Sequence, residues 1–388
     1  MRSTFWFAIL ALFAFHGFAN AATIQATSFS SSHAGTTADP WPGSAIQSAI
    51  AAAQGGDVVL VANGIWSITS ALGNVNEGFT LQGESTDAKL IFSGSGSWTL
   101  GASTAFINNV KISGLTFDGS AITGGTNPVA IQNCINCSFT GNLVIGSSNT
   151  ALATLIFYGG SGNKISSNSV VAGGSASGGA QLQINAFAVS TPLPENNGYD
   201  IDGNYFDSVN LLVIGISNLH IHGNTLVNTT LGNYIAILFA AQYGGINPPV
   251  RNIEIDHNTV DAGAMNGAVI SGVPQDPGGQ GAIDGLVIAD NVVKATIADI
   301  AVNTFDNSCF TTCTSIAQTS DVAIVNNFLT SYWTGSTIDL RGGTYGLVNN
   351  VTVQGNILSG ATWVGPNVIQ TDSNTSNMNK ANNLPSTA

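Results

Sequence analysis

A short phrase of alternating polar and apolar residues recurs three times in the middle of the chain, and each copy ends in asparagine. The copies are Asp200-Ile-Asp-Gly-Asn204, His220-Ile-His-Gly-Asn224 and Glu254-Ile-Asp-His-Asn258. Alternation with a period of two predicts a strand that buries one face and exposes the other. The asparagines lie 20 and then 34 residues apart, which is too far for a hairpin. We therefore interpret the phrases as successive coils of a repeat.

The same signature extends over most of the chain. Phe79–Gly83 and Val110–Phe117 are early copies without asparagine, and every later copy keeps an apolar residue three positions before an asparagine. An irregular period of 20–36 residues with a constant strand-and-asparagine signature is typical of a solenoid. The recurring asparagines are Asn142, Asn168, Asn204, Asn224, Asn258, Asn291, Asn327 and Asn356.

A sharp bend between two strands gives a physical reason for the asparagine. The bend leaves backbone groups without ladder partners, whereas an asparagine amide both donates and accepts and tolerates left-handed backbone geometry. In coils stacked at about 4.8 Å, such amides can bond to their neighbours above and below. We expect the recurring asparagines to form one column of hydrogen bonds.

A helix is predicted ahead of the repeat, over residues 43–54, with Ser44 as its N-cap and Gly55-Gly56 ending it. Strands are predicted at Asp57–Val61 and Ile65–Ile68, on either side of a tight turn. The apolar residues on one face of the helix are Ile46, Ile50 and Ala53.

This opening resembles that of the pectate-lyase superfamily, whose members are right-handed parallel β-helix proteins with an amphipathic helix over the N-terminal end of the coil. The resemblance implies an all-β solenoid of three parallel sheets with an N-terminal capping helix and an asparagine ladder. It implies a single domain over residues 22–388, in which we expect residues 373–388 to be a loose tail. The matching residues are Ile46, Gln47, Ala49, Ile50, Gly56, Asp57 and Gly64.

The resemblance also implies how each coil is divided among the sheets. The strand before each ladder asparagine belongs to the second sheet and the strand after it to the third. First-sheet strands are then expected at Thr154–Tyr158, Gln181–Ala186, Leu211–Gly215, Tyr234–Phe239, Gly267–Ser271, Ile300–Thr304, Ser336–Arg341 and Asn367–Thr371. Long loops between first and second sheets, where a substrate groove is expected, are Ser190–Gly198, Ala240–Pro249, Gly272–Gly281 and Asp306–Ser320.

The N-terminus predicts export. Arg2, an apolar run from Phe5 to Phe18 and Ala19-Asn20-Ala21 make a secretory signal peptide over residues 1–21, which places the protein outside the cell or in the periplasm. The apolar run is too short for a membrane span. Without Arg2, 7 basic and 21 acidic residues remain, a net charge of −14. Such a surface repels nucleic acid, and it disfavours polyanionic glycans unless cations bridge the charges. Nothing in the sequence predicts an oligomeric state.

The four cysteines fall into two local pairs, Cys134 with Cys137 and Cys309 with Cys313. Because an exported protein meets an oxidising compartment, we expect a disulfide within each pair. A zinc site built from all four thiolates is the alternative.

The three central phrases predict one ionisable patch. Asp200, His220 and Glu254 share the position four before the asparagine, and Asp202, His222 and Asp256 share the position two before it. Residues at i and i+2 lie on one face of a strand about 6.5–7 Å apart. All six side chains should therefore project from the same face of the second sheet, with His257 in the adjoining turn.

Three interpretations of the patch stay open. Asp202 and Asp256, with His222, can serve as the catalytic pair of a glycoside hydrolase. The same three residues can instead bind a cation, for which calcium is the candidate. The third interpretation is a solvated polar face without chemistry. In the enzymatic interpretation, the substrate is contacted by Asp200, His220, Glu254 and Tyr243.

The resemblance implies a second place for chemistry, because glycan-processing groups in that superfamily lie mostly on the first sheet. Asp339 and Arg341 alternate outward on a predicted first-sheet strand. A carboxylate beside an arginine resembles the equipment of β-eliminating lyases, and the alternative is a surface ion pair. Asp299, Asp306 and Asp372 are further acidic residues of this sheet and its loops.

These patterns predict a secreted carbohydrate-active protein, a polysaccharide lyase or a glycoside hydrolase that binds an extracellular polysaccharide in a groove along the solenoid. The alternative is a non-catalytic extracellular protein that binds glycans or serves a structural role at a surface. Fold does not decide between them. The polygalacturonase and alginate-epimerase motifs are absent, so no specific activity is predicted.

Overall fold

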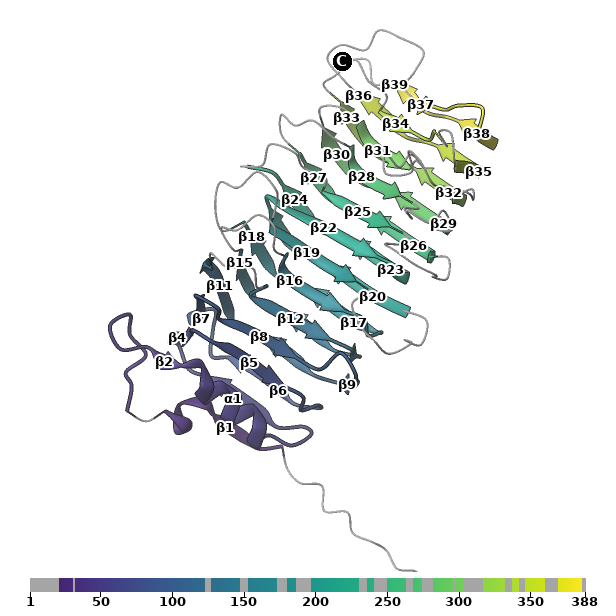
Figure 1. The fold of residues 1–388 in the computed structure, drawn as a ribbon. Coiled ribbons are helices and arrows are strands. Elements are labelled where there is room, and N and C mark those ends of the chain that lie inside the picture. The colour runs from purple at the N-terminus through teal and green to yellow at the C-terminus, as the bar shows by residue number, and fades with distance from the viewer. Residues whose placement is uncertain are drawn as a thin grey trace, which may run out of the picture.

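The computed structural model describes residues 21–30, 32–122, 127–146, 153–172, 180–185, 197–229, 236–240, 250–262, 268–273, 282–295, 298–302, 317–331, 337–341, 346–359 and 369–385. Over these residues the chain winds into stacked coils (Figure 1). A full coil contributes one strand to each of three long sheets, and neighbouring strands pair in parallel. The chain is a right-handed parallel β-helix, as predicted.

Each of the eight predicted first-sheet segments overlaps a strand, with ends that differ by up to three residues, and three earlier strands of this sheet were not predicted. Its strands are β5 (Ala71–Asn74), β8 (Ser97–Leu100), β12 (Val129–Gln132), β16 (Ala153–Tyr158), β19 (Ala180–Asn185), β22 (Val209–Ile214), β25 (Ile237–Ala240), β28 (Ala268–Val273), β31 (Ala298–Val302), β34 (Ile338–Asp339) and β37 (Ile369–Gln370).

The second sheet contains the repeated phrases, each in the strand before a ladder asparagine. Its strands are β1 (Thr23–Gln25), β3 (Val58–Val61), β6 (Thr80–Gly83), β10 (Lys111–Ser113), β14 (Ser138–Thr140), β17 (Asn163–Ser166), β20 (Asn197–Asp202), β23 (Ser217–His222), β26 (Val250–Asp256), β29 (Ala282–Ala289), β32 (Ala317–Val325), β35 (Gly346–Gln354) and β38 (Thr375–Ala381).

The third sheet starts directly after each ladder asparagine. Its strands are β2 (Trp41–Pro42), β4 (Gly64–Ile68), β7 (Ala88–Ser93), β11 (Thr116–Ala121), β15 (Leu143–Ile145), β18 (Ser169–Val171), β21 (Tyr205–Asp207), β24 (Thr225–Val227), β27 (Thr259–Asp261), β30 (Val292–Ala295), β33 (Phe328–Ser331), β36 (Ile357–Ser359) and β39 (Leu384–Pro385). Two short strands, β9 (Ile107–Asn108) and β13 (Cys134–Ile135), pair separately.

Two predictions about segments outside the core strands need correction. The loose tail predicted at 373–388 is wrong for residues 375–385, because they form β38 and β39 of a further coil. The four predicted long loops do lie between first-sheet and second-sheet strands, but β20, β25, β28 and β32 take in residues assigned to them. Most other residues of these loops lie outside the described part of the chain.

The capping helix α1 (Gly43–Ala52) covers the N-terminal end of the solenoid, after the short 3-10 helix η1 (Ala26–Phe29). Ile46, Ile50 and Ala53 are buried as predicted. Ser44 is not the N-cap: the helix begins one residue earlier, directly after Pro42, and has no side-chain cap there. No helix in the described residues is long and apolar enough to cross a membrane.

The interior is filled by columns of apolar side chains, one from each coil. In the second sheet, the residue three before the ladder asparagine points inward, and Ile201, Ile221 and Ile255 are fully buried there. Toward the N-terminal end, aromatic rings from all three sheets contact one another in the interior, with centroids 5.5–6.3 Å apart. These rings belong to Trp98, Phe117, Phe139, Phe157 and Tyr199.

The predicted asparagine column is present. Asn258 shows its bonding: its side-chain nitrogen donates to Oδ1 of Asn291 at 3.0 Å and to the carbonyl of Ile221 at 2.9 Å. Its own Oδ1 accepts from the backbone and side-chain nitrogens of Asn224, both at 3.0 Å. The eight predicted asparagines are at most 2% exposed. Asn383, which was not predicted, continues the column beyond Asn356.

The left-handed backbone geometry lies one residue earlier than the sequence reasoning placed it. It occurs at the residue directly before each ladder asparagine, as in His257 (φ 53°) and Asp290 (φ 53°). A second left-handed position lies six residues before each ladder asparagine. Its occupants are Asn136, Gly162, Gly198, Asn218, Asn252, Gly285, Asp321, Asn350 and Asn377.

We expect Asn258→Ala to lower the free energy of unfolding by about 1–3 kcal/mol, because buried backbone groups lose their partner. Chemical denaturation followed by circular dichroism measures this. Asn379→Ala, at an exposed site of β38, should change stability by less than about 0.5 kcal/mol. An Asn258→Ala variant as stable as the wild type would show that the column does not contribute.

Asp57 should make the N-terminal cap sensitive to acid. Its carboxylate accepts backbone bonds from Ala22 and Gln54, each at 2.8 Å, and these bonds lower the pKa of Asp57. The stabilisation is complete above the carboxyl pKa of the unfolded chain, about 3.9, and is lost as the pH falls through the lower folded pKa.

The stability deficit of Asp57→Asn should accordingly be largest near neutral pH and shrink below pH about 4. Urea unfolding at a series of pH values measures it. A deficit of Asp57→Asn that does not vary with pH would disprove the assignment.

Candidate functional site

The ionisable patch predicted from the repeated phrases lies on β20, β23 and β26, three neighbouring strands of the second sheet. The register is the predicted one: His220 lies between Asp200 and Glu254, and His222 lies between Asp202 and Asp256. Because the intervening isoleucines are buried in the core, the alternation of the strand turns these polar side chains outward.

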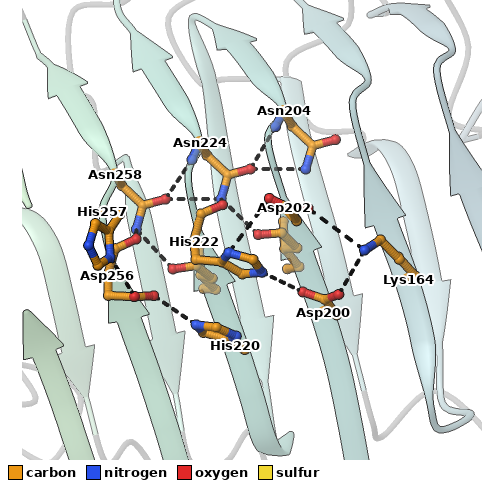
Figure 2. Close-up of polar contacts among 12 residues, drawn as sticks. Lys164, Asp200, Asp202, Asn204, His220, His222, Asn224, Asp256, His257 and Asn258 are labelled. Atoms are coloured by element: carbon orange, nitrogen blue, oxygen red, sulfur yellow. Dashed lines mark hydrogen bonds and ion pairs between the residues drawn. The ribbon is translucent and has the colours of Figure 1, made fainter.

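The side chains pair diagonally rather than with their direct neighbours. Nε2 of His222 lies 2.8 Å from Oδ1 of Asp200, and Nε2 of His220 lies 2.7 Å from Oδ1 of Asp256. Figure 2 shows the two pairs on opposite sides of β23. The imidazole rings lie nearly parallel, with centroids 3.9 Å apart and an angle of 13° between planes. Each ring is thus held by a carboxylate and by the other ring.

Lys164 on β17 extends the patch on the side of Asp200. Its Nζ lies 3.2 Å from Oδ2 of Asp200 and 3.7 Å from Oδ2 of Asp202. Asp202 also approaches the second nitrogen of His222, with 3.6 Å between Oδ1 and Nδ1. Lys164 occupies the same repeat position as Asp200, four before an asparagine. Its place in the patch could therefore have been predicted from the repeat.

His257 extends the patch on the other side. Its Nδ1 lies 2.7 Å from Oδ2 of Asp256. Both carboxylate oxygens of Asp256 are therefore bonded to imidazoles, one from His220 and one from His257. The left-handed turn that precedes Asn258 brings the His257 ring beside Asp256.

The network favours the charged forms of four of its members, Lys164, Asp200, Asp256 and His257. Partial burial raises the pKa of Asp200, but hydrogen bonds with His222 and Lys164 outweigh it and hold that pKa below the ordinary value. Asp256 shows the same balance, with His257 and His220 lowering its pKa. The hydrogen bond to Asp256 raises the pKa of His257, and the bond to Asp200 raises the pKa of Lys164.

These contacts bear on the predicted hydrolase pair of Asp202 and Asp256. A glycosidase needs one carboxyl group whose pKa is raised, so that it can donate a proton. The pKa of Asp256 is shifted the other way, and both of its oxygens are engaged. Asp256 is therefore held as a carboxylate and is poorly suited to donate a proton.

Two sets of side chains in the patch could hold a metal ion. In the described residues, donor atoms of Asp200, His220 and His222 lie within 4.8 Å of one another, and so do those of His220, Glu254 and Asp256. Neither set is the predicted one of Asp202, His222 and Asp256. The difference arises from the diagonal pairing, which separates His222 from Asp256 and joins His220 to it.

The first-sheet candidates lie elsewhere, at the end of β34 near the C-terminal coils. Arg341 donates from Nε to Oδ1 of Asp339 at 2.9 Å and from Nη2 to Oδ2 at 2.6 Å. The two residues form the expected pair, but Asp339 is only 7% exposed and its carboxylate is occupied by the guanidinium. Asp372 accepts the backbone N–H of Asn374 in a turn.

Other predicted residues have varied outcomes. Cys134 and Cys137 form the expected disulfide. The pair Cys309 and Cys313, the loop residue Tyr243 and Asp306 lie outside the described residues, as does the signal peptide up to residue 20. The side chain of Asp299 is likewise not described.

Comparison with known proteins finds only distant structural likeness and no family. No protein-family model matches this sequence, and no curated protein matches it. Among solved structures, the catalytic unit of a GH87 α-1,3-glucanase from Streptomyces thermodiastaticus has 13% identity over 93% of this chain and 68% of its own, with a TM-score of 0.49.

Two further structures have a similar degree of likeness. Endo-xylogalacturonan hydrolase from Aspergillus tubingensis has 12% identity over 88% of this chain and 92% of its own, with a TM-score of 0.49. PfbA, a surface adhesin of Streptococcus pneumoniae, has 12% identity over 93% of this chain and 92% of its own, with a TM-score of 0.46. These similarities carry no statement about the activity of this chain.

The Asp339–Arg341 pair predicts an asymmetric response to mutation. Arg341→Ala leaves a buried carboxylate without its partner, and we expect it to cost about 2–3 kcal/mol of unfolding free energy. Asp339→Asn leaves an exposed arginine and a neutral amide, and should cost about 1 kcal/mol or less. Urea unfolding measures both.

Arg251→Ala is the matched control, because Arg251 and Asp284 form an exposed ion pair at 3.6 Å. It should change stability by less than about 1 kcal/mol. Equal losses for Arg341→Ala and Arg251→Ala would mean that the burial of Asp339 has no energetic consequence.

Proposed function

We propose that this chain is a secreted polysaccharide-active protein that cleaves an acidic polysaccharide by β-elimination, with the second-sheet patch as its active site. The observation that carries the proposal is the Asp200–His222 pair. The carboxylate of Asp200 lies 2.8 Å from Nε2 of His222, so it fixes the proton on that nitrogen and leaves Nδ1 as the basic one. A carboxylate-oriented imidazole is a recurrent general base of enzymes.

The surroundings of His222 suit a base that becomes cationic during the reaction. Asp202 lies 3.6 Å from Nδ1 and stabilises the imidazolium once the proton is taken. Lys164 bridges Asp200 and Asp202 and keeps both carboxylates in place. The side chain of His222 is 29% exposed, so a polymer lying across the outer face of the sheet can reach it.

The proposed step is balanced without water or an oxidant. Nδ1 of His222 removes the C5 proton, which is acidified by the adjacent uronate carboxyl group. The electron pair forms the C4=C5 double bond, and the bond between C4 and the glycosidic oxygen breaks. The imidazolium returns the proton to the departing oxygen. The products are a chain with an unsaturated uronate end and a chain with a new hydroxyl group.

A bound cation belongs to this proposal. The patch contains the carboxylates of Asp200, Asp202, Glu254 and Asp256 but only one lysine, so an incoming uronate would meet net negative charge. A divalent cation offsets that repulsion, and calcium, the cofactor suggested by the sequence, is one ion that can do so. Chelation with EDTA should then lower activity.

Export is part of the proposal too. The disulfide between Cys134 and Cys137 is compatible with an oxidising compartment, and the N-terminal pattern suits a signal peptide. We therefore propose an extracellular or periplasmic location. The second candidate function is glycan binding without turnover, which the openness of the patch favours: the side chain of His220 is 40% exposed.

The test is a screen of the full-length mature protein against plant, algal and bacterial polysaccharides. It follows both the absorbance of unsaturated uronates and the appearance of reducing ends. On a cleaved uronate polymer, His222→Ala should lower kcat about a hundredfold or more, because the base is removed.

His33→Ala is the matched control, since His33 forms a comparable pair with Asp39 at 2.8 Å outside the patch, and it should keep full activity. Reducing ends without unsaturated products would replace elimination by hydrolysis. Cleavage that persists in His222→Ala but disappears in Arg341→Ala would move the active site to the first sheet. Polymer binding without cleavage would leave the binding function.

A further inference from the structure

Three potential metal ligands converge on one half of the patch, beside the proposed base. His220 comes from β23, while Glu254 and Asp256 come from β26, and their donor atoms all lie within 4.8 Å of one another. The strand register explains the convergence: Glu254 is the direct neighbour of His220 across the ladder, and Asp256 is its diagonal neighbour. One imidazole and two carboxylates can supply three ligands to a single ion.

Neighbouring side chains hold two of these ligands in place. Nδ1 of His257 lies 2.7 Å from Oδ2 of Asp256, which leaves Oδ1 directed at His220. The side chain of Asp256 is only 15% exposed. The His220 ring is packed flat against the ring of His222. Such outer contacts orient ligands in known metal sites and are part of what distinguishes a site from a chance cluster.

We propose that His220, Glu254 and Asp256 bind one divalent transition-metal ion of the zinc class. Zinc takes imidazole nitrogen and carboxylate oxygen at about 2.0–2.2 Å, often with three protein ligands and one open position. The distance of 2.7 Å between Nε2 of His220 and Oδ1 of Asp256 needs only a small opening, because two ligands of a tetrahedral ion lie about 3.3 Å apart at those bond lengths.

The other candidate set, Asp200 with His220 and His222, suits an ion less well. The lone pair of an imidazole nitrogen lies in the plane of its ring. The two ring planes are nearly parallel and their centroids are 3.9 Å apart, so one ion cannot lie in both planes without a large rotation of a ring. The set with a single histidine avoids this conflict.

The imidazole ligand of His220 also makes calcium less suitable than zinc as the bound ion. Calcium takes six to eight oxygen ligands, whereas imidazole suits zinc, copper, iron and nickel. The inference therefore deepens the proposed function by naming the class of cation beside the base. Zinc binding itself needs no polysaccharide, so it can be measured independently of cleavage.

The experiment uses the full-length mature protein without a histidine tag, stripped of metal by a chelator that is then dialysed away. Zinc chloride is titrated in a calorimeter, and the bound zinc is counted after equilibrium dialysis. We expect one ion per chain, and a melting temperature that rises with zinc. Glu254→Gln, an exposed and isosteric change, and His220→Gln should each weaken binding at least about tenfold.

Two controls make the result specific. His33→Gln removes a histidine from the His33–Asp39 pair, which has similar exposure but belongs to neither metal-ligand set, and it should bind zinc as the wild type does. His222→Gln should weaken binding less than His220→Gln, because it removes a packing partner and not a ligand.

The inference is overturned if the wild type shows no saturable zinc binding, or if Glu254→Gln binds zinc as tightly as the wild type. Equal loss in His220→Gln and His222→Gln with normal binding by Glu254→Gln would assign the ion to the other set. Zinc binding that is intact while no polymer is cleaved would sustain this site and remove the lyase proposal. Cleavage by a protein that does not bind zinc would do the reverse.

Discussion

The register between neighbouring coils is the constraint on which the rest of the structure depends. Asn224 donates both its backbone and side-chain nitrogens to one oxygen of Asn258, and the same contact recurs from coil to coil. A slip by one residue would break this column and turn the buried isoleucines outward. Because the register holds, polar residues that are distant in sequence become direct neighbours on the outer face. The ionisable patch therefore depends on the register that the asparagine column fixes.

Within the patch, each histidine of β23 pairs with a carboxylate on a neighbouring strand. His220 and His222 stack on each other and reach diagonally to Asp256 and Asp200. This arrangement places an imidazole between carboxylates on adjacent coils, and it leaves Lys164 to hold the outer oxygen of Asp200. Hydrogen bonds in this network lower the pKa of Asp200 and Asp256 and keep both ionised. Asp256 is therefore poorly suited to donate a proton, and the proposed function assigns the proton transfer to an imidazole instead.

The register between coils could be predicted from the sequence, but the side-chain pairing could not, for a physical reason. The period of the phrase decides which residues face outward and which lie opposite one another, so the neighbourhood of Asp200 and His220 was predictable. Which imidazole nitrogen bonds to which carboxylate oxygen depends on side-chain rotamers. The alternation of polar and apolar residues does not predict those rotamers. Asn383 was not predicted because Lys380 lies three positions before it, where all eight predicted ladder asparagines have an apolar residue. The left-handed residue was placed at the asparagine itself, although the bend puts it one position earlier.

The shortage of uncommitted positive charge links the two candidate sites. Arg341 is bound in bidentate fashion by Asp339, and Lys164 is shared between Asp200 and Asp202. The chain has 21 acidic and 8 basic residues, so a polyanion gains little from the protein's own cations at either place. An ion bound by His220, Glu254 and Asp256 would reduce the negative charge of the patch locally, beside His222. In the proposed function the metal and the base would act together: the base acts on a substrate with an acidified proton, and the metal would lower the repulsion that such an anionic substrate meets at the patch.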